Sequence, residues 1–418
     1  MKLIKTSFYA GIITFIKIAS GFIAAKFIAK TTGPPGVALL GQFTSFLAIV
    51  LTFSNGAISN GIVKYTAEFE NSPNKLKVLF STALKISIII SVLIGSIFLI
   101  FSNFISKYVL YSYQFSNVIK VLGLTLVFYS INLLLISILN GLKQIKIFTI
   151  ANATAAVFSL ILTIILVHFY KIEGALYALV VTQTFSFVLT ILLIKKVQWF
   201  SFDYFNSRFD KELMRKLAGY GLISLVSAIT MPLAQMKFRD IIIDNLGIDA
   251  AGYWQGLMRI SDGYLLLINT SISIYYLPKL ASLKTDEEIR SEIFNGFKLI
   301  LPVTLIGCIL IYFCRFLIIR TLYSESFLEM ENLFFFQLLG DLVKVASMMI
   351  GYLLIAKSMV KTAIFTEALF SVIWVGSGYF LIRKLGLEGS TISFFITYTI
   401  YFIIVVFIFK KIIFLKKQ

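Results

Sequence analysis

Apolar stretches of about 20 residues, separated by short polar connections, run along almost the whole chain. An α-helix rises about 1.5 Å per residue, so about 20 apolar residues cross about 30 Å of hydrocarbon. Windows of this kind lie near residues 8–29, 38–63, 78–101, 118–140, 148–169, 174–194, 217–239, 252–277, 294–313, 331–355, 361–382 and 389–409. The pattern predicts an all-α polytopic membrane protein with about twelve transmembrane helices.

The composition agrees with this class. Of 418 residues, 59% are hydrophobic and 14% are charged, and the mean hydropathy is +0.92. These values exclude a soluble globular chain. Lys17 and Lys26 interrupt the first apolar stretch, and further spans follow it, so we expect no cleaved signal peptide.

The formal net charge of +18 is distributed unevenly over the connections. Most loop lysines and arginines fall in alternate connections, including Lys2 and Lys5, the segment 195–216, and the lysines between 410 and 417. Cytoplasmic loops carry such an excess, so both termini are predicted to be cytoplasmic. Topology thus explains the positive charge, and nucleic acid is not expected as a partner.

The sequence also predicts an internal repeat. A shift of 215 residues places Lys146 on Lys361, Glu173-Gly174 on Glu388-Gly389, and Lys195-Lys196 on Lys410-Lys411. Near the start, a shift of 213 places Lys26 on Arg239 and Gln42 on Gln255. We therefore expect a six-helix lobe over residues 1–196, a cytoplasmic linker over 197–216 and a second six-helix lobe over 217–418. Because six is even, both lobes enter the membrane from the same side, which is a parallel repeat.

Basic side chains occur within or beside several of the spans. They are Lys17, Lys26, Lys237, Arg239, Arg259 and Lys344. A Lys or Arg at the bilayer centre costs about 2.5 to 3.5 kcal/mol on insertion scales, so such residues usually face a bundle interior or a water-filled path. Several together indicate a central cavity that admits an anionic substrate.

Lys17 is the strongest candidate for that cavity. It lies near the middle of the first span, whereas Lys26 lies near the outer end and can reach the interface. Nine positions place the two lysines on opposite helix faces. Lys237 and Arg239 follow Pro232 near the end of the seventh span, and cavity and interface positions both remain open for them. Pro232 itself fits either a moving gate or an ordinary kink.

Acidic residues accompany two of the basic ones. Arg259 and Asp262, and likewise Asp341 and Lys344, stand three residues apart on one helix face, where each pair can be an internal ion pair. Glu367, in the eleventh span, joins these two aspartates as a candidate either for ion coupling or for charge neutralisation.

Four amides, Gln42, Gln255, Asn55 and Asn60, suit sugar hydroxyls in the cavity, although packing between helices is the favoured role.

Sequence motifs for catalysis are absent. The chain has no glycine-rich phosphate loop followed by Lys and Ser or Thr, no HExxH motif and no paired-Cys metal spacing. We therefore expect a transporter without metal or cofactor. An ion-coupled drug antiporter and a membrane polysaccharide polymerase or ligase are the alternatives. The first six spans hold no acidic residue in mid-membrane, which counts against the antiporter, and the outer loops are short for a polymerase.

Several segments resemble the Wzx-type flippases of bacterial lipid-linked oligosaccharides, closest to the enterobacterial common antigen and O-antigen members. The resemblance covers nearly the whole chain. It rests on Phe15-Ile16-Lys17-Ile18, Gly33-Pro34-Pro35-Gly36, Asn60-Gly61-Ile62-Val63-Lys64-Tyr65, Trp254-Gln255-Gly256, Ile260-Ser261-Asp262 with Tyr264, Leu277-Pro278, Gln337-Leu338 with Gly340-Asp341 and Lys344, and Gly351-Tyr352 with Ile355-Ala356-Lys357.

The resemblance implies a two-lobed fold of the multidrug/oligosaccharidyl-lipid/polysaccharide exporter superfamily in the bacterial inner membrane. It further implies that an oligosaccharide on undecaprenyl pyrophosphate moves from the cytoplasmic to the periplasmic leaflet by alternating access, with its lipid tail in the bilayer. Lys17, Lys26, Asp262, Asp341 and Lys344 stand where similar sequences have them. We expect a monomer, with a polysaccharide polymerase and a chain-length regulator as candidate partners.

Overall fold

The computed structural model describes residues 2–195, 197 and 200–414, and the regular structure of these residues is helical throughout. Lys196, Lys416 and Lys417, which contribute to the predicted cytoplasmic charge, lie outside the described residues. The chain forms two compact units, one of residues 1–32 with 39–233 and one of residues 33–38 with 234–418. The division at the segment 197–216, which follows the sequence repeat, stays a prediction.

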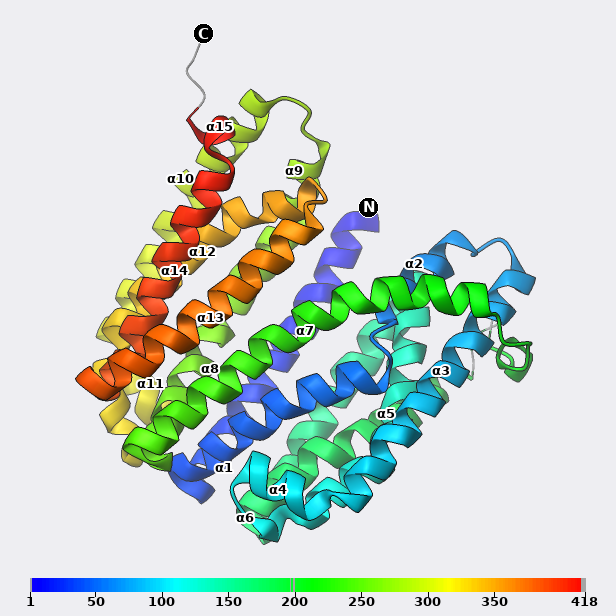
Figure 1. The fold of residues 1–418 in the computed structure, drawn as a ribbon, viewed down its shortest axis with the longest axis horizontal. Coiled ribbons are helices and arrows are strands. Elements are labelled where there is room, and N and C mark those ends of the chain that lie inside the picture. Colours follow the sequence, from blue (N-terminus) through cyan, green and yellow to red (C-terminus); the bar gives the residue numbers. More distant parts are fainter. Residues whose placement is uncertain (1, 196, 198–199, 415–418) are drawn as a thin grey trace. The chain divides into compact units, whose positions relative to one another are not determined.

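The first unit is built around α5, which packs against α2, α3, α4 and α6 (Figure 1). Its elements are α1 (Lys2–Ser54), α2 (Ser59–Glu68), α3 (Pro73–Ile100), α4 (Ser102–Leu110), η1 (Tyr113–Phe115), α5 (Ser116–Gly141), α6 (Ile145–Ile194), η2 (Phe202–Phe205) and the first part of α7 (Lys211–Leu246). Gly33 to Ala38 of α1 belong to the second unit.

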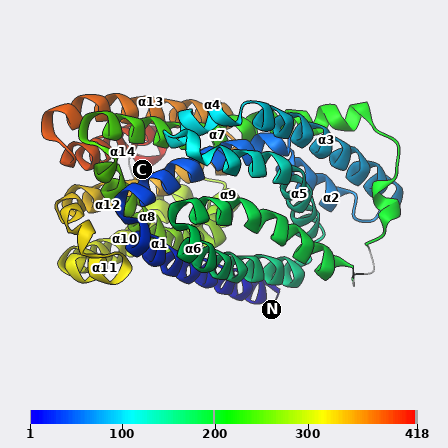
Figure 2. The same cartoon turned by 90° about the horizontal axis from the view of Figure 1, so that it is seen from below.

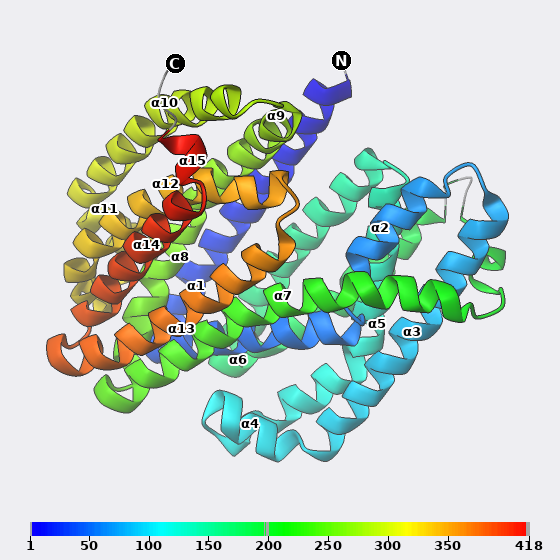
Figure 3. The same ribbon diagram turned by 45° about the horizontal axis from the view of Figure 1, so that its top comes forward.

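The second unit is built around α12, which packs against α10, α13 and α14 (Figure 2). Its elements after α7 are α8 (Ile248–Ser271), a π-helical turn η3 (Ile272–Tyr276), α9 (Leu277–Ser282), α10 (Asp286–Phe313), α11 (Arg315–Leu322), η4 (Glu325–Leu333), α12 (Phe334–Ala356), α13 (Val360–Leu385), α14 (Glu388–Ile408) and α15 (Lys410–Ile413). Figure 3 shows α13 and α14 side by side.

Within the described residues, eight helices are long and apolar enough to cross a membrane. Two of them each contain two predicted spans, because α1 and α6 each comprise two helical segments that meet at a kink, where Gly33 and Lys171 have non-helical backbone. The second predicted window, 38–63, is interrupted, since α1 ends at Ser54 and α2 begins at Ser59. The seventh and eighth windows lie on α7 and α8, outside those eight helices.

The predicted repeat is confirmed by backbone geometry inside each unit. Lys143 and Ser358, which are equivalent under the 215-residue shift, both have a φ of 55°. Lys171 and Gly386 are equivalent in the same way, with φ values of 50° and 64°. Residues other than glycine rarely adopt a positive φ. Its recurrence at equivalent positions therefore reflects a shared turn and not chance similarity between apolar sequences.

A close helix contact is also repeated. A Cβ atom on Gly95 of α3 would lie 2.5 Å from the carbonyl oxygen of Gly123 on α5. In the second unit, Cys308 and Leu338 occupy the positions related by shifts of 213 and 215, and Cys308 Sγ lies 3.7 Å from the Leu338 carbonyl oxygen. The glycines of the first unit therefore allow a closer approach of two backbones than ordinary side chains permit.

Replacing Gly95 with alanine should destabilise the first unit by about 1 to 3 kcal/mol, because its Cβ would meet backbone and α3 would have to move away from α5. Thermal unfolding of the purified protein in detergent measures this. Gly307→Ala in α10 is the matched control, since a Cβ there has nothing within 4 Å. Equal unfolding temperatures for the two variants would contradict the close contact.

Candidate functional site

A buried carboxylate joins α8 to α12 in the second unit. Asp341 has no exposed surface. The Ser261 hydroxyl lies 2.7 Å from both of its carboxylate oxygens, Gln337 Nε2 donates to Oδ1 at 3.2 Å, and the Tyr264 hydroxyl donates to Oδ2. A buried polar group is costly unless such partners satisfy it. Asp341 therefore acts as a polar clasp between the two helices.

Helix periodicity explains how these side chains meet. Gln337, Asp341 and Lys344 follow one another at spacings of four and three residues, so they form one stripe of α12. Ser261 and Tyr264 are likewise three residues apart on α8 and share the face that contacts Asp341. Ser261 and Tyr264 belong to the motif that carries the family resemblance, but sequence reasoning did not assign them to the site. The sequence did contain a signal for them, because two hydroxyl side chains stand three residues apart next to an aspartate in a predicted span.

Lys344 forms its ion pair with Asp262 on α8, whereas Asp341 on its own helix was the expected partner. Its Nζ lies 3.8 Å from Asp262 Oδ1 on α8, and the side chains are 14% and 59% exposed, respectively. The same ammonium lies 5.7 Å from the ring centroid of Phe394 and 5.6 Å from that of Tyr398, both on α14. The structure thus replaces the two expected pairs within single helices by one pair across helices, because hydroxyl and amide donors already occupy Asp341.

Arg259, the remaining member of those expected pairs, is half-buried and forms no ion pair within 4.0 Å among the described residues.

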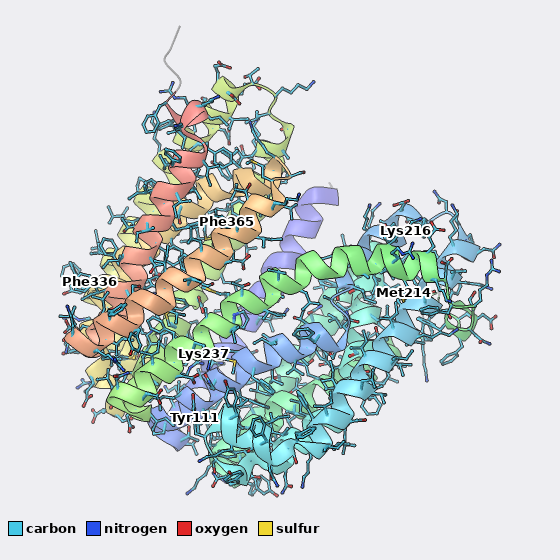
Figure 4. All side chains as sticks on the ribbon, viewed as in Figure 1. Tyr111, Met214, Lys216, Lys237, Phe336 and Phe365 are labelled. Carbon is cyan, nitrogen blue, oxygen red and sulfur yellow. The ribbon has the colours of Figure 1, made fainter. Side chains whose placement is uncertain are left out.

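Arg239 is buried within the second unit, with 1% of its surface exposed. Its guanidinium donates a hydrogen bond to Gln255 Oε1 and lies 5.3 Å from the ring of Trp254. Lys237, two residues earlier on α7, is exposed and pairs with Asp240 at 3.3 Å (Figure 4). The two cations at the end of the seventh span therefore have different environments. Arg239 is buried in protein and does not lie at a solvated interface.

In the first unit, the predicted cavity lysines lie on α1. Lys17 is exposed, and its Nζ donates to Asn152 Oδ1 on α6 at 3.2 Å. The Asn152 amide nitrogen donates to the Phe148 carbonyl oxygen, which turns its oxygen toward Lys17. Sequence reasoning missed Asn152, because an isolated amide in an apolar span carries no pattern. Lys26 is exposed on the same helix.

The remaining predicted site residues have varied surroundings. Asn55 is buried, donates to Ser59 Oγ at 2.7 Å and accepts from Ser87 Oγ at 2.9 Å, which supports the packing role. Gln42 is buried and Asn60 is exposed. Glu367 is half-buried on α13. Pro232 lies inside α7, which continues as helix through it.

The repeat shows that the Asp341 network is particular to the second unit. Under the 215-residue shift, Asp341 and Lys344 correspond to Leu126 and Tyr129. Under the 213-residue shift, Ser261 and Asp262 correspond to Ala48 and Ile49. The first unit therefore forms the equivalent helices with mostly apolar side chains at these positions. The fold itself does not require a buried carboxylate there.

One family model and two curated relatives match most of the chain. The family model described as polysaccharide biosynthesis protein matches residues 6–332. The Lipid III flippase of Escherichia coli (strain K12) is 26% identical over 406 residues, which cover 96% of this chain and 97% of that protein. The Lipid III flippase of Shigella flexneri matches to the same extent.

Solved structures show the fold. An inward-facing multidrug resistance MATE family transporter of the MOP superfamily matches with a TM-score of 0.82 at 15% identity, covering 97% of this chain and 98% of that chain. A MOP superfamily transporter from Pyrococcus furiosus matches with a TM-score of 0.72 at 15% identity, covering 100% and 96%. Identities this low establish the architecture and not the cargo.

Replacing Asp341 with alanine should destabilise the protein by roughly 2 to 4 kcal/mol, because it removes the acceptor of three buried donors. Asp262→Ala should cost less than about 1 kcal/mol, since that carboxylate is largely exposed and its pair is long. Chemical denaturation in mixed micelles compares the two variants. Similar losses at both positions would contradict the clasp.

Proposed function

The chain belongs to the polysaccharide biosynthesis protein family, and from this premise we propose that it is a flippase for a lipid-linked oligosaccharide. Its curated relatives at 26% identity are Lipid III flippases, and the alignment spans nearly all of both chains. It is a multi-pass membrane protein and a transporter rather than an enzyme.

The observation that carries the proposal is the set of cations within or beside the predicted spans. Arg239 is buried beside Trp254 and Gln255, and Lys344 lies near two aromatic rings and forms one long ion pair with the exposed Asp262. Such groups are retained in a membrane where they meet an anionic partner or a water-filled path. The pyrophosphate of an undecaprenyl-linked repeat unit is an anion of this kind, and acidic sugars would add to the charge.

The binding residues follow from this assignment. Lys17, Lys26, Lys237, Arg239, Arg259 and Lys344 would supply positive charge to the cavity, while Gln42, Gln255 and Asn60 would offer amides to sugar hydroxyls. The lipid tail would remain in the bilayer. A monomer suffices for this arrangement, and a polysaccharide polymerase and a chain-length regulator would act on the delivered units.

Alternating access needs bending points between the compact units. Both helices that contribute to the two units carry proline at the crossing. In α1 the unit changes at Gly33, directly before Pro34 and Pro35, and in α7 it changes after Leu233, directly after Pro232. Proline removes a backbone donor and weakens the helix locally. These positions would serve as hinges during transport from the cytoplasmic to the periplasmic leaflet of the inner membrane, with both termini cytoplasmic.

Drug export by the same fold is the alternative within the superfamily. The MATE transporters are 14% to 15% identical to this chain, a level that supports a shared fold only. Mid-membrane acidic residues would suit a cationic drug, but the first six predicted spans have none. The cationic excess favours an anionic cargo.

Deletion of the chain in its host should cause the lipid-linked repeat unit to accumulate in the cytoplasmic leaflet, because the proposed flippase for this unit is missing. Leaflet-specific labelling of the glycan in spheroplasts and in inside-out vesicles measures the distribution. Re-expression of the full chain is the control. A normal periplasmic pool in the deletion strain would reject the flippase.

Lys17→Gln should lower the surface glycan about tenfold, since a charge-assisted contact to a phosphate contributes about 1.5 kcal/mol or more. Lys17→Arg should restore most of the export, because it keeps the positive charge. Lys30→Gln on the same helix makes the same charge change at an exposed position near the predicted outer end and should have little effect. Quantitative glycan immunoblots compare the three, normalised to membrane protein content. Full export by Lys17→Gln would remove this residue from the cavity.

Pro232→Ala should slow export several-fold without loss of thermal stability, because alanine restores the helical hydrogen bond and stiffens α7 at the unit boundary. Export is followed as glycan delivery over time after induction. Pro302→Ala in α10, which lies inside one unit, is the matched control. Unchanged export kinetics in Pro232→Ala would argue for an ordinary packing proline.

A further inference from the structure

The Asp262–Lys344 pair differs from every other contact in the Asp341 network. Its 3.8 Å separation exceeds hydrogen-bonding distance, and the Asp262 side chain is 59% exposed. Asp341 is fully enclosed and accepts hydrogen bonds from Ser261, Tyr264 and Gln337. The two carboxylates thus stand near one another on adjacent helices, one fixed and one loosely engaged.

Lys344 keeps its position by contacts other than this ion pair. Its side chain is only 14% exposed, and its ammonium lies near the rings of Phe394 and Tyr398 on α14. Cation–π attraction of this kind strengthens when the cation is desolvated, as it is here. Loss of Asp262 as a partner would therefore leave the ammonium in place and open to another anion.

The exposed surface of Asp262 is expected to face water. The residue lies about ten positions into the predicted window 252–277, which corresponds to about 15 Å of helix. A carboxylate exposed to hydrocarbon at that depth would be costly, so an exposed one must border a hydrated path. An anionic group moving along that path can reach Lys344 from the side of Asp262.

The fold does not need this pair. The first unit has Ile49 and Tyr129 at the equivalent positions, and its corresponding helices form without a charge at either one. An exposed pair longer than a hydrogen bond also contributes little to stability. The first unit folds without this ion pair, so we expect the pair to have a role other than structural support.

We propose that Asp262 is a tethered counter-ion that holds Lys344 between transport events and that the phosphate groups of the cargo displace it. This inference rests on the proposed flippase function. A diphosphate carries more negative charge and more acceptor oxygens than one carboxylate, so it displaces Asp262 and binds Lys344. Asp262 belongs to the same chain, so its effective concentration near Lys344 is high. It therefore competes with the bound phosphate for Lys344 and promotes release of the cargo. Asp262 thereby sets affinity and residence time without touching the cargo.

The test measures binding of farnesyl diphosphate to the full chain in lipid nanodiscs by calorimetry and its dissociation rate by surface plasmon resonance, with neutral farnesol as the comparison probe. Asp262→Asn should tighten the dissociation constant about three- to tenfold and slow dissociation by a similar factor, because the competing anion is gone. Asp262→Ala should behave alike and serves as a second variant. Lys344→Gln should weaken binding, and adding Asp262→Asn to it should give no gain.

Glu212→Gln is the control for a general change in net charge, because it removes a carboxylate from an exposed pair with Lys216 at 2.8 Å. Its binding should equal that of the wild type. Unchanged or weaker binding by both Asp262 variants would overturn the counter-ion role, as would a gain that persists in the Lys344→Gln background. In those cases the preference for the diphosphate would still stand. Equal binding of farnesol and farnesyl diphosphate by the wild type would instead overturn the anionic cargo itself, and the counter-ion role with it.

Discussion

A charged group inside a membrane protein must be hydrogen-bonded, paired or hydrated, and the Asp341 carboxylate meets this constraint by hydrogen bonding alone. Its three donors come from Ser261 and Tyr264 on α8 and from Gln337 on its own helix. Once these donors are committed to Asp341, Lys344 reaches toward Asp262 and the α14 aromatic rings. The arrangement of every other charge in the network follows from this one satisfied carboxylate.

The internal repeat separates the helical framework that both units share from the polar residues that only the second unit carries. The turns at Lys143 and Ser358, and at Lys171 and Gly386, recur with the same backbone conformation, so the helical framework is common to both units. The polar residues are not common, because Leu126 stands in the first unit where Asp341 stands in the second. The helical framework common to both units therefore does not depend on these charges, and in the second unit the Asp341 hydrogen bonds add to the apolar packing.

Sequence periodicity predicted most of the fold. Apolar windows located the helices, and the charged anchors gave the repeat in the register that the backbone confirms. The two spans predicted in α1 and the two predicted in α6 are likewise separate helical segments, because Gly33 and Lys171 have non-helical backbone at the kinks between them.

The candidate site was less accessible to sequence reasoning. Spacing shows which residues share a face of one helix, as it did for Asp341 and Lys344. It does not show which neighbour that face meets, so the pairing of Lys344 with Asp262 and the contact of Lys17 with Asn152 came only from tertiary structure. The burial of Arg239 had the same origin, since the end of the seventh span could not be placed from hydropathy alone.

Rigid and compliant features occur at different places in the chain. The clasp at Asp341 and the close backbones at Gly95 and Gly123 lie inside single units, where movement would leave donors unsatisfied or backbones in collision. The prolines of α1 and α7 lie where each helix passes from one unit to the other. A transporter that changes access by moving whole units needs this distribution, because bending inside a unit would break the polar network that holds its cations in position.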